Sequence, residues 1–330
     1  MTPDSDYKPS LVSIAGGTGR YPLLEGVRDH YQVTALYNIT DSGGSSEILR
    51  VEHGTLPPGD GTQALAALTE DPDHRLFLLD RFTTGRVDNH RIANLMYEVA
   101  CRKFGGDVGA MKYLARLFQV RGQVLPISLA RGVHLIAQLE DGTTLEREDI
   151  IDNRGSGSPI VDARLSSPAH ILPETEQCLR SADLIIFGPG DLWTSVIPHL
   201  LVTGVPEAIQ CSLATKIMMC NLATKPGETD GYTASDFARF VVERVGGKLD
   251  YLFVNSNHID QSVKTAYANQ GQQLVVRDGS ENRYAHHVVE IDLVTMIENG
   301  SGHRLLRHDP DKTNRAISLA YHKDLLQILS

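Results

Sequence analysis

Two glycine-rich turns carry the most specific chemical signal in this sequence. The run Gly188-Pro189-Gly190-Asp191 follows an apolar stretch at 182–187 and leads into a segment with helical spacing. The run Gly16-Gly17-Thr18-Gly19 follows another apolar stretch, at 11–15, in the same manner. A strand that ends in such a turn and continues as a helix exposes backbone N–H groups at its carboxyl end, where an anion can bind. The two turns therefore predict one phosphate-bearing ligand over the edge of a parallel sheet.

Both turns also have a purely structural interpretation. A dinucleotide fingerprint would place a third glycine where Pro22 stands, and the chain has no Walker-type run, so a tight turn without a ligand stays open at 16–19. The second turn could be a strand-to-helix connection capped by Asp191 or Thr194. Trp193 could stack on a base or a sugar, but a place in the core is favoured for the chain's only tryptophan.

A polar segment with one carboxylate follows the second predicted strand. The run Asp41-Ser42-Gly43-Gly44-Ser45-Ser46 lies after the strand expected at 32–39. An acidic residue about 20 positions beyond a glycine turn can bind a ribose hydroxyl, and it can equally hold Mg²⁺. A flexible glycine-serine loop is the alternative, but the position at the carboxyl end of a strand favours a functional role for Asp41.

Two further segments add polar side chains. Residues 221–229 follow another predicted strand, where Asn221 can read an amide or a base edge and Lys225 can meet a phosphate, although a surface loop would look the same. His90 and Asn94 lie one helical turn apart, so both can face one site, but a lone histidine is more often structural. The histidines and cysteines show no spacing typical of metal ligands or of a catalytic nucleophile, so no transition-metal site is predicted.

The bulk composition limits the classes of partner. The chain has 330 residues, 41% of them hydrophobic, and a formal net charge of −10. This composition supports a globular core, and the acidic balance argues against nucleic acid or an anionic membrane as a partner. No apolar run approaches the roughly 20 residues that span a bilayer. Because the four cysteines suggest free thiols and the first residues lack an apolar signal core, a cytoplasmic protein is expected.

Alternating strands and helices must position these groups. The pattern predicts an α/β fold: a three-layer, Rossmann-like, mostly parallel sheet with helices on both faces and a β-hairpin insertion at 133–148. Residues 1–10 are expected to be a flexible tail, and 11–330 a single domain with a loop-rich internal boundary near 153–168. Strands are expected at 11–15, 32–39, 184–187, 216–221, 251–255 and 273–277. Helices are expected at 21–30, 63–68, 89–104, 107–118, 194–201, 235–245, 260–269 and within 311–329.

Five runs considered together resemble the CofD-like family over nearly the whole chain. They are Gly16-Gly17-Thr18-Gly19, Asp41-Ser42-Gly43-Gly44-Ser45-Ser46, Pro57-Pro58-Gly59-Asp60, residues 188–198 and residues 220–229. The family has two branches. One is 2-phospho-L-lactate transferase, which moves a phospholactyl group onto a deazaflavin and uses a divalent metal. The other is the gluconeogenesis factor (YvcK-type) branch, which resembles a nucleotide-sugar sensor that binds UDP-N-acetylglucosamine and links carbon metabolism to cell-wall synthesis.

Several details resemble the gluconeogenesis factor branch more closely. They are the run that starts at Lys225, the Tyr267 that stands between two alanines, and the Arg307 that precedes His-Asp-Pro. In that branch the matching tyrosine and arginine are implied to contact the nucleotide-sugar, and an arginine can hold a diphosphate through two N–H groups. The chain departs from the branch after Asp41, where Ser42 replaces a usual second aspartate, and after Asp60, where Gly-Thr-Gln replaces a usual Ile-Arg-Asn. These departures weaken a metal site and a phosphate contact.

The resemblance and the residues together predict a regulatory protein that binds a small nucleotide conjugate, such as a nucleotide-sugar. The resemblance alone implies a homodimer. Whether the chain is also an enzyme stays open: the alternative is a Mg²⁺-dependent transferase that moves a phospholactyl-type group from a nucleotide-activated donor to a deazaflavin. A nicotinamide dehydrogenase is disfavoured by the missing third glycine. The predicted catalytic residues are Asp41, Asp60 and His90, with Asp41 also as the metal ligand. The predicted ligand-binding residues are Gly16, Gly17, Thr18, Gly19, Asp41, Gly43, Gly44, Ser45, Asn94, Gly188, Pro189, Gly190, Asp191, Thr194, Ser195, Asn221, Lys225, Tyr267 and Arg307.

Overall fold

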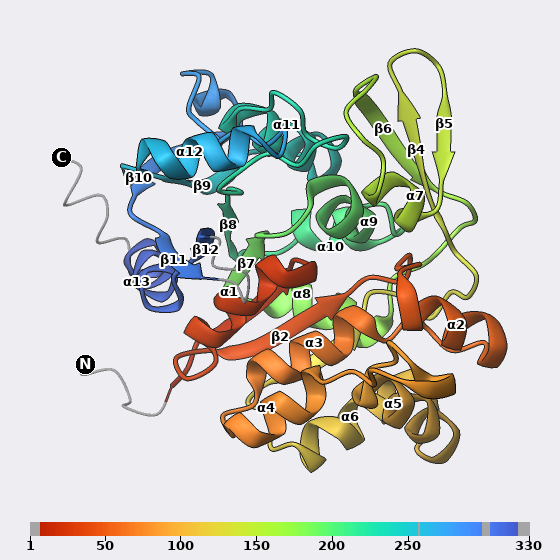
Figure 1. Cartoon of the computed structure of the whole chain (residues 1–330). Helices are drawn as coiled ribbons and strands as arrows, with labels where there is room; N and C mark the ends of the chain where they lie inside the picture. Colours follow the sequence, from red (N-terminus) through yellow and green to blue (C-terminus); the bar gives the residue numbers. More distant parts are fainter. Residues whose placement is uncertain (1–6, 257, 299–303, 323–330) are drawn as a thin grey trace.

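Parallel strands form the centre of the protein, which the computed structural model describes over residues 7–256, 258–298 and 304–322 (Figure 1). Seven strands pair in the order β10-β9-β8-β7-β1-β2-β3, and every pairing is parallel. Short apolar runs suit such a sheet because helices cover both of its faces. The strands are β1 (Ser10–Ile14), β2 (Gln32–Tyr37), β3 (Gln123–Pro126), β7 (Leu184–Phe187), β8 (Thr215–Met219), β9 (Leu249–Asn255) and β10 (Ala285–Ile291).

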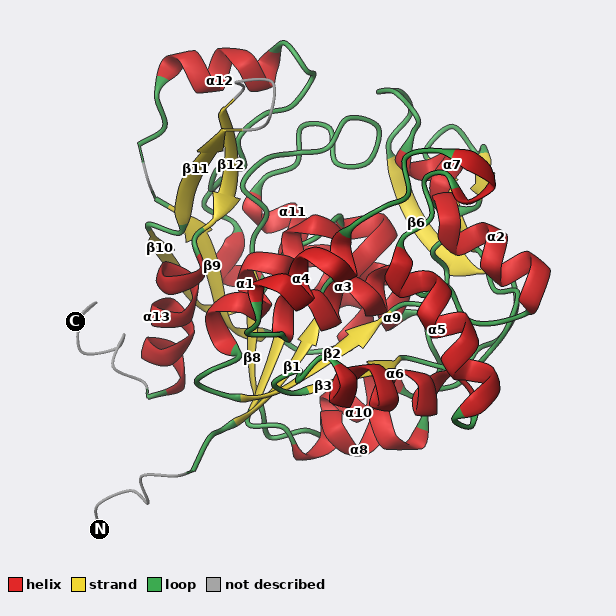
Figure 2. Cartoon of the chain, turned by 60° about the horizontal axis from the view of Figure 1, so that its bottom comes forward, coloured by secondary structure: helices red, strands yellow, loops and turns green. Residues whose placement is uncertain are grey.

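Helices lie on both sides of this sheet. Figure 2 shows α1 (Arg20–Val27) and α3 (Gly59–Leu68) on one side, and α8 (Pro173–Ser181) and α10 (Val205–Gln210) on the other. The three-layer, Rossmann-like α/β fold is therefore confirmed. The other helices are α2 (Gly44–His53), α4 (Pro72–Leu79), α5 (Ile92–Lys103), α6 (Gly106–Leu117), α7 (Glu148–Asp152), α9 (Ile197–Leu200), α11 (Ala234–Val245), α12 (Gln261–Ala268) and α13 (Pro310–Tyr321).

The strand order reverses between β1 and β7. From β1 the chain adds β2 and β3 on one side, and from β7 it adds β8, β9 and β10 on the other. Ile14 pairs with Phe187 in the register, so the two central strands end at the same level. The crevice outside the carboxyl ends of strands at such a reversal is where open α/β sheets bind ligands. The two glycine turns follow these strand ends directly, so the topology brings them together.

The core interpretation of Trp193 is confirmed. Its side chain is 0% exposed, and its ring lies against Phe240 with the ring centroids 4.6 Å apart. The indole Nε1 donates a hydrogen bond to the Tyr232 hydroxyl at 3.3 Å. Trp193 therefore anchors the segment after the second glycine turn and offers no free face to a ligand.

Two small antiparallel sheets are added to the central one. The predicted hairpin is confirmed as β4 (Leu135–Leu139) and β5 (Thr144–Glu146), and β6 (Ile160–Leu165) pairs with the other edge of β4. The stretch at 153–168 thus contains a strand that its glycine, serine and proline content did not indicate. The second sheet pairs β11 (Val294–Glu298) with β12 (Arg304–His308).

The structure also corrects two predicted elements. The strand predicted at 273–277 is wrong: Leu274 forms only an isolated bridge to Ala223, and the amide of Ala234 bonds to the carbonyl of Val276 instead of a strand neighbour. The helix predicted at 89–104 begins only at Ile92, because Arg91 is extended and bridges to Arg81. His90 therefore lies before the helix, not one turn from Asn94 on it.

None of the helices in the described ranges combines the length and the apolar character that a membrane span requires.

Candidate functional site

The two glycine turns touch each other where the strand order reverses. A Cβ on Gly190 would lie 2.8 Å from the carbonyl oxygen and 2.9 Å from the nitrogen of Gly16. A Cβ on Gly19 would lie 3.2 Å from the nitrogen of Gly190. Gly190 also has a φ of 154°, which residues with a side chain rarely adopt. The contact therefore requires glycine, and it places both turns beside one cavity.

We call this cavity the glycine cleft; its volume is about 350 Å³. It is lined by residues 16–19 and 189–191 together with Asn221, Tyr267 and Arg307. Asn221 follows β8, Tyr267 lies on α12, and Arg307 lies on β12. Tyr267 and Leu306 also belong to a small second apolar core, so α12 and β12 pack together beside the cleft.

Hydrogen bonds to the protein hold the polar side chains of the glycine cleft in place and leave some of their donors available to a ligand. The Asn221 amide donates to the carbonyl of Gly190 at 2.9 Å, and the Tyr267 hydroxyl accepts from the amide of Leu306 at 2.8 Å. The Arg307 guanidinium donates to the carbonyl of Leu306 at 3.1 Å. Within the described ranges, no carboxylate oxygen lies within 4.0 Å of that guanidinium. Its remaining N–H groups can therefore bind an anion.

A carboxylate stands beside the first glycine turn. The Gly17 amide donates to Asp60 Oδ1 at 3.2 Å, so one amide of the turn already binds an anionic group of the protein. Arg20, which is 2% exposed, donates to the carbonyl of Asp60 at 3.4 Å and to that of Leu36 at 2.6 Å. This buried cation ties the first turn of α3, which carries Asp60, to the carboxyl end of β2.

Asp41 lies next to Asp60 at the carboxyl end of β2. It accepts a hydrogen bond from the Gly43 amide at 2.9 Å, and a Cβ on Gly59 would lie 2.6 Å from Asp41 Oδ2. Burial and the negative charge of Asp60 raise the pKa of Asp41 to about 6. In the described ranges Asp41 has no ion-pair partner within 4.0 Å. Two neighbouring carboxylates, such as Asp41 and Asp60, can together bind a hard cation such as Mg²⁺.

The hairpin insertion brings further carboxylates to this edge. The Ser42 amide donates to Glu148 Oε2 at 3.3 Å, and the Ser42 hydroxyl donates to Asp149 Oδ1 at 2.8 Å, so α7 is docked on the turn after β2. Burial and the charge of Asp41 raise the pKa of Glu148 to about 8. We call Asp41, Asp60 and Glu148 the acidic edge. Because their pKa values are raised, Asp41 and Glu148 keep their protons to higher pH than ordinary carboxyl groups do.

Lys225 neutralises a second group of carboxylates. Oxygen atoms of Asp152, Asp191 and Glu228 lie within 4.8 Å of one another. The Lys225 ammonium lies 2.8 Å from Asp191 and 2.9 Å from Glu228, and it also pairs with Asp152. Although burial disfavours its charge, the carboxylates of Glu228 and Asp191 raise the pKa of Lys225. The ammonium thus occupies the position that a metal would take, and we call these four residues the lysine cluster.

Replacing Asp41 by asparagine should change the pH dependence of stability. The pKa of Asp41 is about 6 in the folded state and 3.8 in its ordinary environment. Between about pH 4 and pH 7 the folded state therefore binds more protons than the unfolded state, and the stability of the fold falls as pH rises. Asp41→Asn removes this cost, and we expect it to gain about 1–2 kcal/mol relative to wild type between these pH values. Urea unfolding at both pH values measures the difference. Glu52→Gln, on the exposed side of α2, is the charge-matched control; an equal difference at both pH values would contradict the prediction.

The structure places the other predicted residues in different surroundings. Lys225 does not line the glycine cleft, since its ammonium is held in the lysine cluster. The Thr194 hydroxyl donates to Glu228 at 3.3 Å, and Ser195 packs directly behind Gly16, where a Cβ would lie 2.6 Å from Ser195 Cβ. Asn94 Oδ1 accepts from the Thr62 hydroxyl at 2.8 Å. His90 is 9% exposed.

The remaining predicted residues lie at the two turns after β2 and β7. Gly188 is followed by the cis peptide to Pro189. Gly43 and Gly44 stand where α2 begins. The side chain of Ser45, on the same helix, lies outside the described part of the chain.

The sequence analysis did not predict several residues of the site. Glu148 and Asp152 stand four positions apart on α7, a spacing that indicates a shared helix face. Glu228 follows the predicted Lys225 by three positions, in a turn. Nothing local indicates that α7 docks on the turn after β2. Arg20 is also missed, because an arginine in a helix is ordinarily exposed.

Comparisons with known proteins agree on one family. Residues 11–294 match the family model described as 2-phospho-L-lactate transferase CofD. The gluconeogenesis factor of Bacillus subtilis is 35% identical over 311 residues, which cover 92% of this chain and 96% of that protein. The gluconeogenesis factor of Halalkalibacterium halodurans is 35% identical over 316 residues, covering 94% and 96%. A crystal structure of a Bacillus halodurans protein has a TM-score of 0.87 and 34% identity, covering 94% of this chain and 100% of that one.

Proposed function

This chain belongs to the CofD family, and from that membership we propose that it is a regulatory protein that binds a nucleotide-sugar of the UDP-N-acetylglucosamine type in the glycine cleft. The lining of the cleft is the observation that carries the proposal. Both glycine turns line the cleft and can offer backbone amides to a diphosphate, and Arg307 adds charge-assisted N–H donors without a carboxylate partner in the described ranges. The relatives named gluconeogenesis factor support a role in carbon metabolism. A link from there to cell-wall synthesis is part of the proposal.

The geometry suggests how such a ligand would lie. The diphosphate would rest on the amides of Thr18, Gly19 and Gly190, since the Gly17 amide is already bonded to Asp60. The sugar or base end would extend toward Tyr267 and Arg307. The Tyr267 hydroxyl accepts from the chain, so its own proton remains available as a donor to the ligand.

A ligand panel tests the class of molecule that binds. Thermal unfolding is followed with UDP-N-acetylglucosamine, UDP-glucose, GDP, NAD and a deazaflavin, each with and without Mg²⁺. A ligand that binds only the folded state raises the midpoint with its concentration. We expect the largest shift from a UDP-sugar. A response to the deazaflavin or NAD with none to any UDP-sugar would overturn the proposal.

Arg307→Ala should weaken the binding of UDP-N-acetylglucosamine by about 30-fold, because a charge-assisted hydrogen bond contributes about 1.5–3 kcal/mol. Isothermal titration calorimetry measures the affinity, and thermal unfolding of the ligand-free variant should stay close to wild type. The matched control is Arg304→Ala, an exposed arginine on the same strand, which should bind as wild type does. Unchanged affinity in Arg307→Ala would remove this residue from the site.

A second candidate function rests on the acidic edge. Asp41 and Asp60 lie beside the first glycine turn, and both fit a divalent cation by their oxygen donors and by their crowding. A bound Mg²⁺ would neutralise charge that develops on a phosphoryl group. In such a transferase an acceptor hydroxyl would form the new P–O bond, the P–O bond to the nucleoside monophosphate would break, and an Asp41 oxygen not bound to the cation would accept the hydroxyl proton.

Turnover separates the two functions. The chain is mixed with a guanylyl-activated phosphoacid, a deazaflavin acceptor and Mg²⁺, and release of the nucleoside monophosphate is followed. Release that depends on the acceptor and disappears in Asp41→Asn would favour the transferase. Without release, a UDP-sugar response in the ligand panel would favour the regulatory protein.

A further inference from the structure

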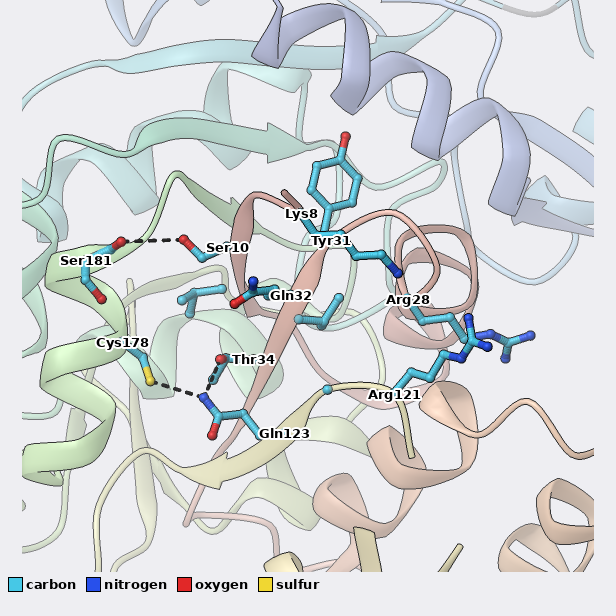
Figure 3. A pocket seen from close by; sticks show the side chains of 13 residues that line it. Lys8, Ser10, Arg28, Tyr31, Gln32, Thr34, Arg121, Gln123, Cys178 and Ser181 are labelled. Atoms are coloured by element: carbon cyan, nitrogen blue, oxygen red, sulfur yellow. Dashed lines mark hydrogen bonds between the residues drawn. The ribbon is translucent and has the colours of Figure 1, made fainter. Parts of the chain in front are cut away.

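A second cavity opens at the opposite edge of the central sheet (Figure 3). Its volume is about 720 Å³, within the range of small-molecule sites. It lies among the amino ends of β1, β2 and β3 and the last turn of α8, marked by Ser10, Gln32, Gln123 and Ser181. The glycine cleft lies at the carboxyl ends of β1, β7 and β8, so this amino-edge cavity is a separate place on the molecule.

The charge of the amino-edge cavity differs from that of the whole chain. Lys8, Arg28 and Arg121 are the charged side chains among its described lining residues, and all three are cationic. The chain itself carries a formal net charge of −10. A cavity whose lining is purely basic, in an acidic protein, focuses a local field that attracts anions.

The carboxylates nearby leave part of this charge unused. Asp29 and Glu70 each lie 2.7 Å from the Arg121 guanidinium, on the outer side where both partners are exposed. Arg28 Nε lies 3.8 Å from Asp29 Oδ2, beyond hydrogen-bond distance. Lys8 has no carboxylate partner within 4.0 Å in the part of the chain that the structure describes.

Arg28 is held in place and still has an open donor. Its Nη1 donates to the carbonyls of Ala67 and Thr69 at 3.0 and 2.8 Å, which fixes the guanidinium at the carboxyl end of α3. Its Nε is buried and has no hydrogen-bond partner among the described residues. This N–H can therefore donate to a further acceptor.

Neutral side chains complete the lining. The Gln123 amide donates to the Thr34 hydroxyl at 2.8 Å and also contacts Cys178, and Ser10 and Ser181 stand beside them, as Figure 3 shows. The Ser10 hydroxyl donates to the Asp183 carboxylate at 2.7 Å, and the Ser181 hydroxyl donates to the carbonyl of Gln177 at 2.8 Å. The hydroxyl oxygens and the Gln123 side-chain oxygen can still accept hydrogen bonds from the hydroxyls of a small polyol. The cavity thus offers cations on one side and neutral hydrogen-bonding groups on the other.

We propose that the amino-edge cavity is a second ligand site, which takes a small hydroxylated organic anion with two or more negative charges. A sugar phosphate and a hydroxylated polycarboxylate share this chemistry. The proposal does not depend on what the glycine cleft binds.

Isothermal titration calorimetry with three probes tests the site: glucose 6-phosphate, citrate and inorganic phosphate. We expect saturable binding of glucose 6-phosphate or citrate with a Kd of about 1 mM or tighter, and weaker binding of phosphate, which lacks the polyol. Preference for glucose 6-phosphate or for citrate then decides between the two sources. Lys8→Glu should weaken binding at least about tenfold, and Arg121→Gln should weaken it as well, because each removes a lining cation.

Two variants serve as controls. Lys103→Glu makes the same charge change at an exposed position on α5 and should bind as wild type does, and so should Arg307→Ala in the glycine cleft. The proposal is overturned if glucose 6-phosphate and citrate both fail to bind, if phosphate binds as tightly as they do, or if Lys8→Glu binds them normally. Equal weakening by Lys8→Glu and Lys103→Glu would also overturn it, because general charge would then explain the effect. Loss of binding in Arg307→Ala would place the anion in the glycine cleft.

Discussion

Replacing Lys225 by methionine is expected to lower the free energy of unfolding by about 3 kcal/mol near pH 8.5. The ammonium is bonded to three carboxylates, and one of them, on Glu228, has a side chain that is 0% exposed. Removing the cation leaves that buried charge without compensation, which costs far more than the loss of a surface ion pair. The expected loss of stability is no larger because the Asp152 and Asp191 side chains are 33% and 38% exposed, so water can solvate them when the ammonium is removed.

The loss should depend on pH in a defined direction. Without the ammonium, the folded chain must take up a proton on Glu228, whose pKa burial and Asp191 already raise. The folded state then binds more protons than the unfolded state, so the stability of Lys225→Met should fall more steeply than that of wild type between about pH 6 and pH 9. Urea unfolding across this range measures the slope.

A double-mutant cycle supplies the control. Glu228→Gln in the Lys225→Met background removes the uncompensated charge and should restore a large part of the lost stability. The prediction fails if Lys225→Met is as stable as wild type at pH 8.5, or if Glu228→Gln lowers the stability of that variant further.

Gly190→Ala is expected to cost about 3 kcal/mol of stability and to abolish ligand binding in the glycine cleft. The new methyl group would meet the backbone oxygen and nitrogen of Gly16 at 2.8 and 2.9 Å, and the φ of 154° would be strained in addition. Gly16 has little room to shift, because Ser195 also packs closely on it: a Cβ on Gly16 would lie 2.6 Å from Ser195 Cβ. The two turns would therefore have to separate, which opens the cleft between them.

Urea unfolding and calorimetry with UDP-N-acetylglucosamine measure the two effects. Gly155→Ala is the matched control, since a Cβ at Gly155 meets nothing within 4 Å and its stability should stay within about 0.5 kcal/mol of wild type. A Gly190→Ala protein with wild-type stability would show that the contact between the turns is not tight.

The meeting of the two glycine turns could be predicted from the sequence because the signals are local. An apolar run that ends in glycines indicates the carboxyl end of a buried strand, and parallel strands share that edge. Asn221 follows from the same reasoning, and it lines the same cleft. The ligand that these residues bind stays a prediction.

Long-range pairing could not be predicted in the same way. Lys225 is a plausible phosphate ligand from its neighbours alone, but Asp152 and Asp191 reach it from distant segments and hold its ammonium. The error at His90 has a similar origin, because a bridge between Arg81 and Arg91 keeps that stretch extended where the local pattern favours a helix. In both places a tertiary contact outweighs the local preference.

The junction of Gly16 with Gly190 joins the first half of the chain to the second, and this has a consequence for biosynthesis. During synthesis β1, β2 and β3 emerge from the ribosome before β7 does. At that stage only the first glycine turn is present, so the anion-binding site is incomplete. If the glycine cleft binds a nucleotide-sugar as proposed, binding begins only when the late strands have joined the sheet. From then on, each tenfold rise in metabolite above its Kd adds about 1.4 kcal/mol against global unfolding and against proteases that cleave the opened chain.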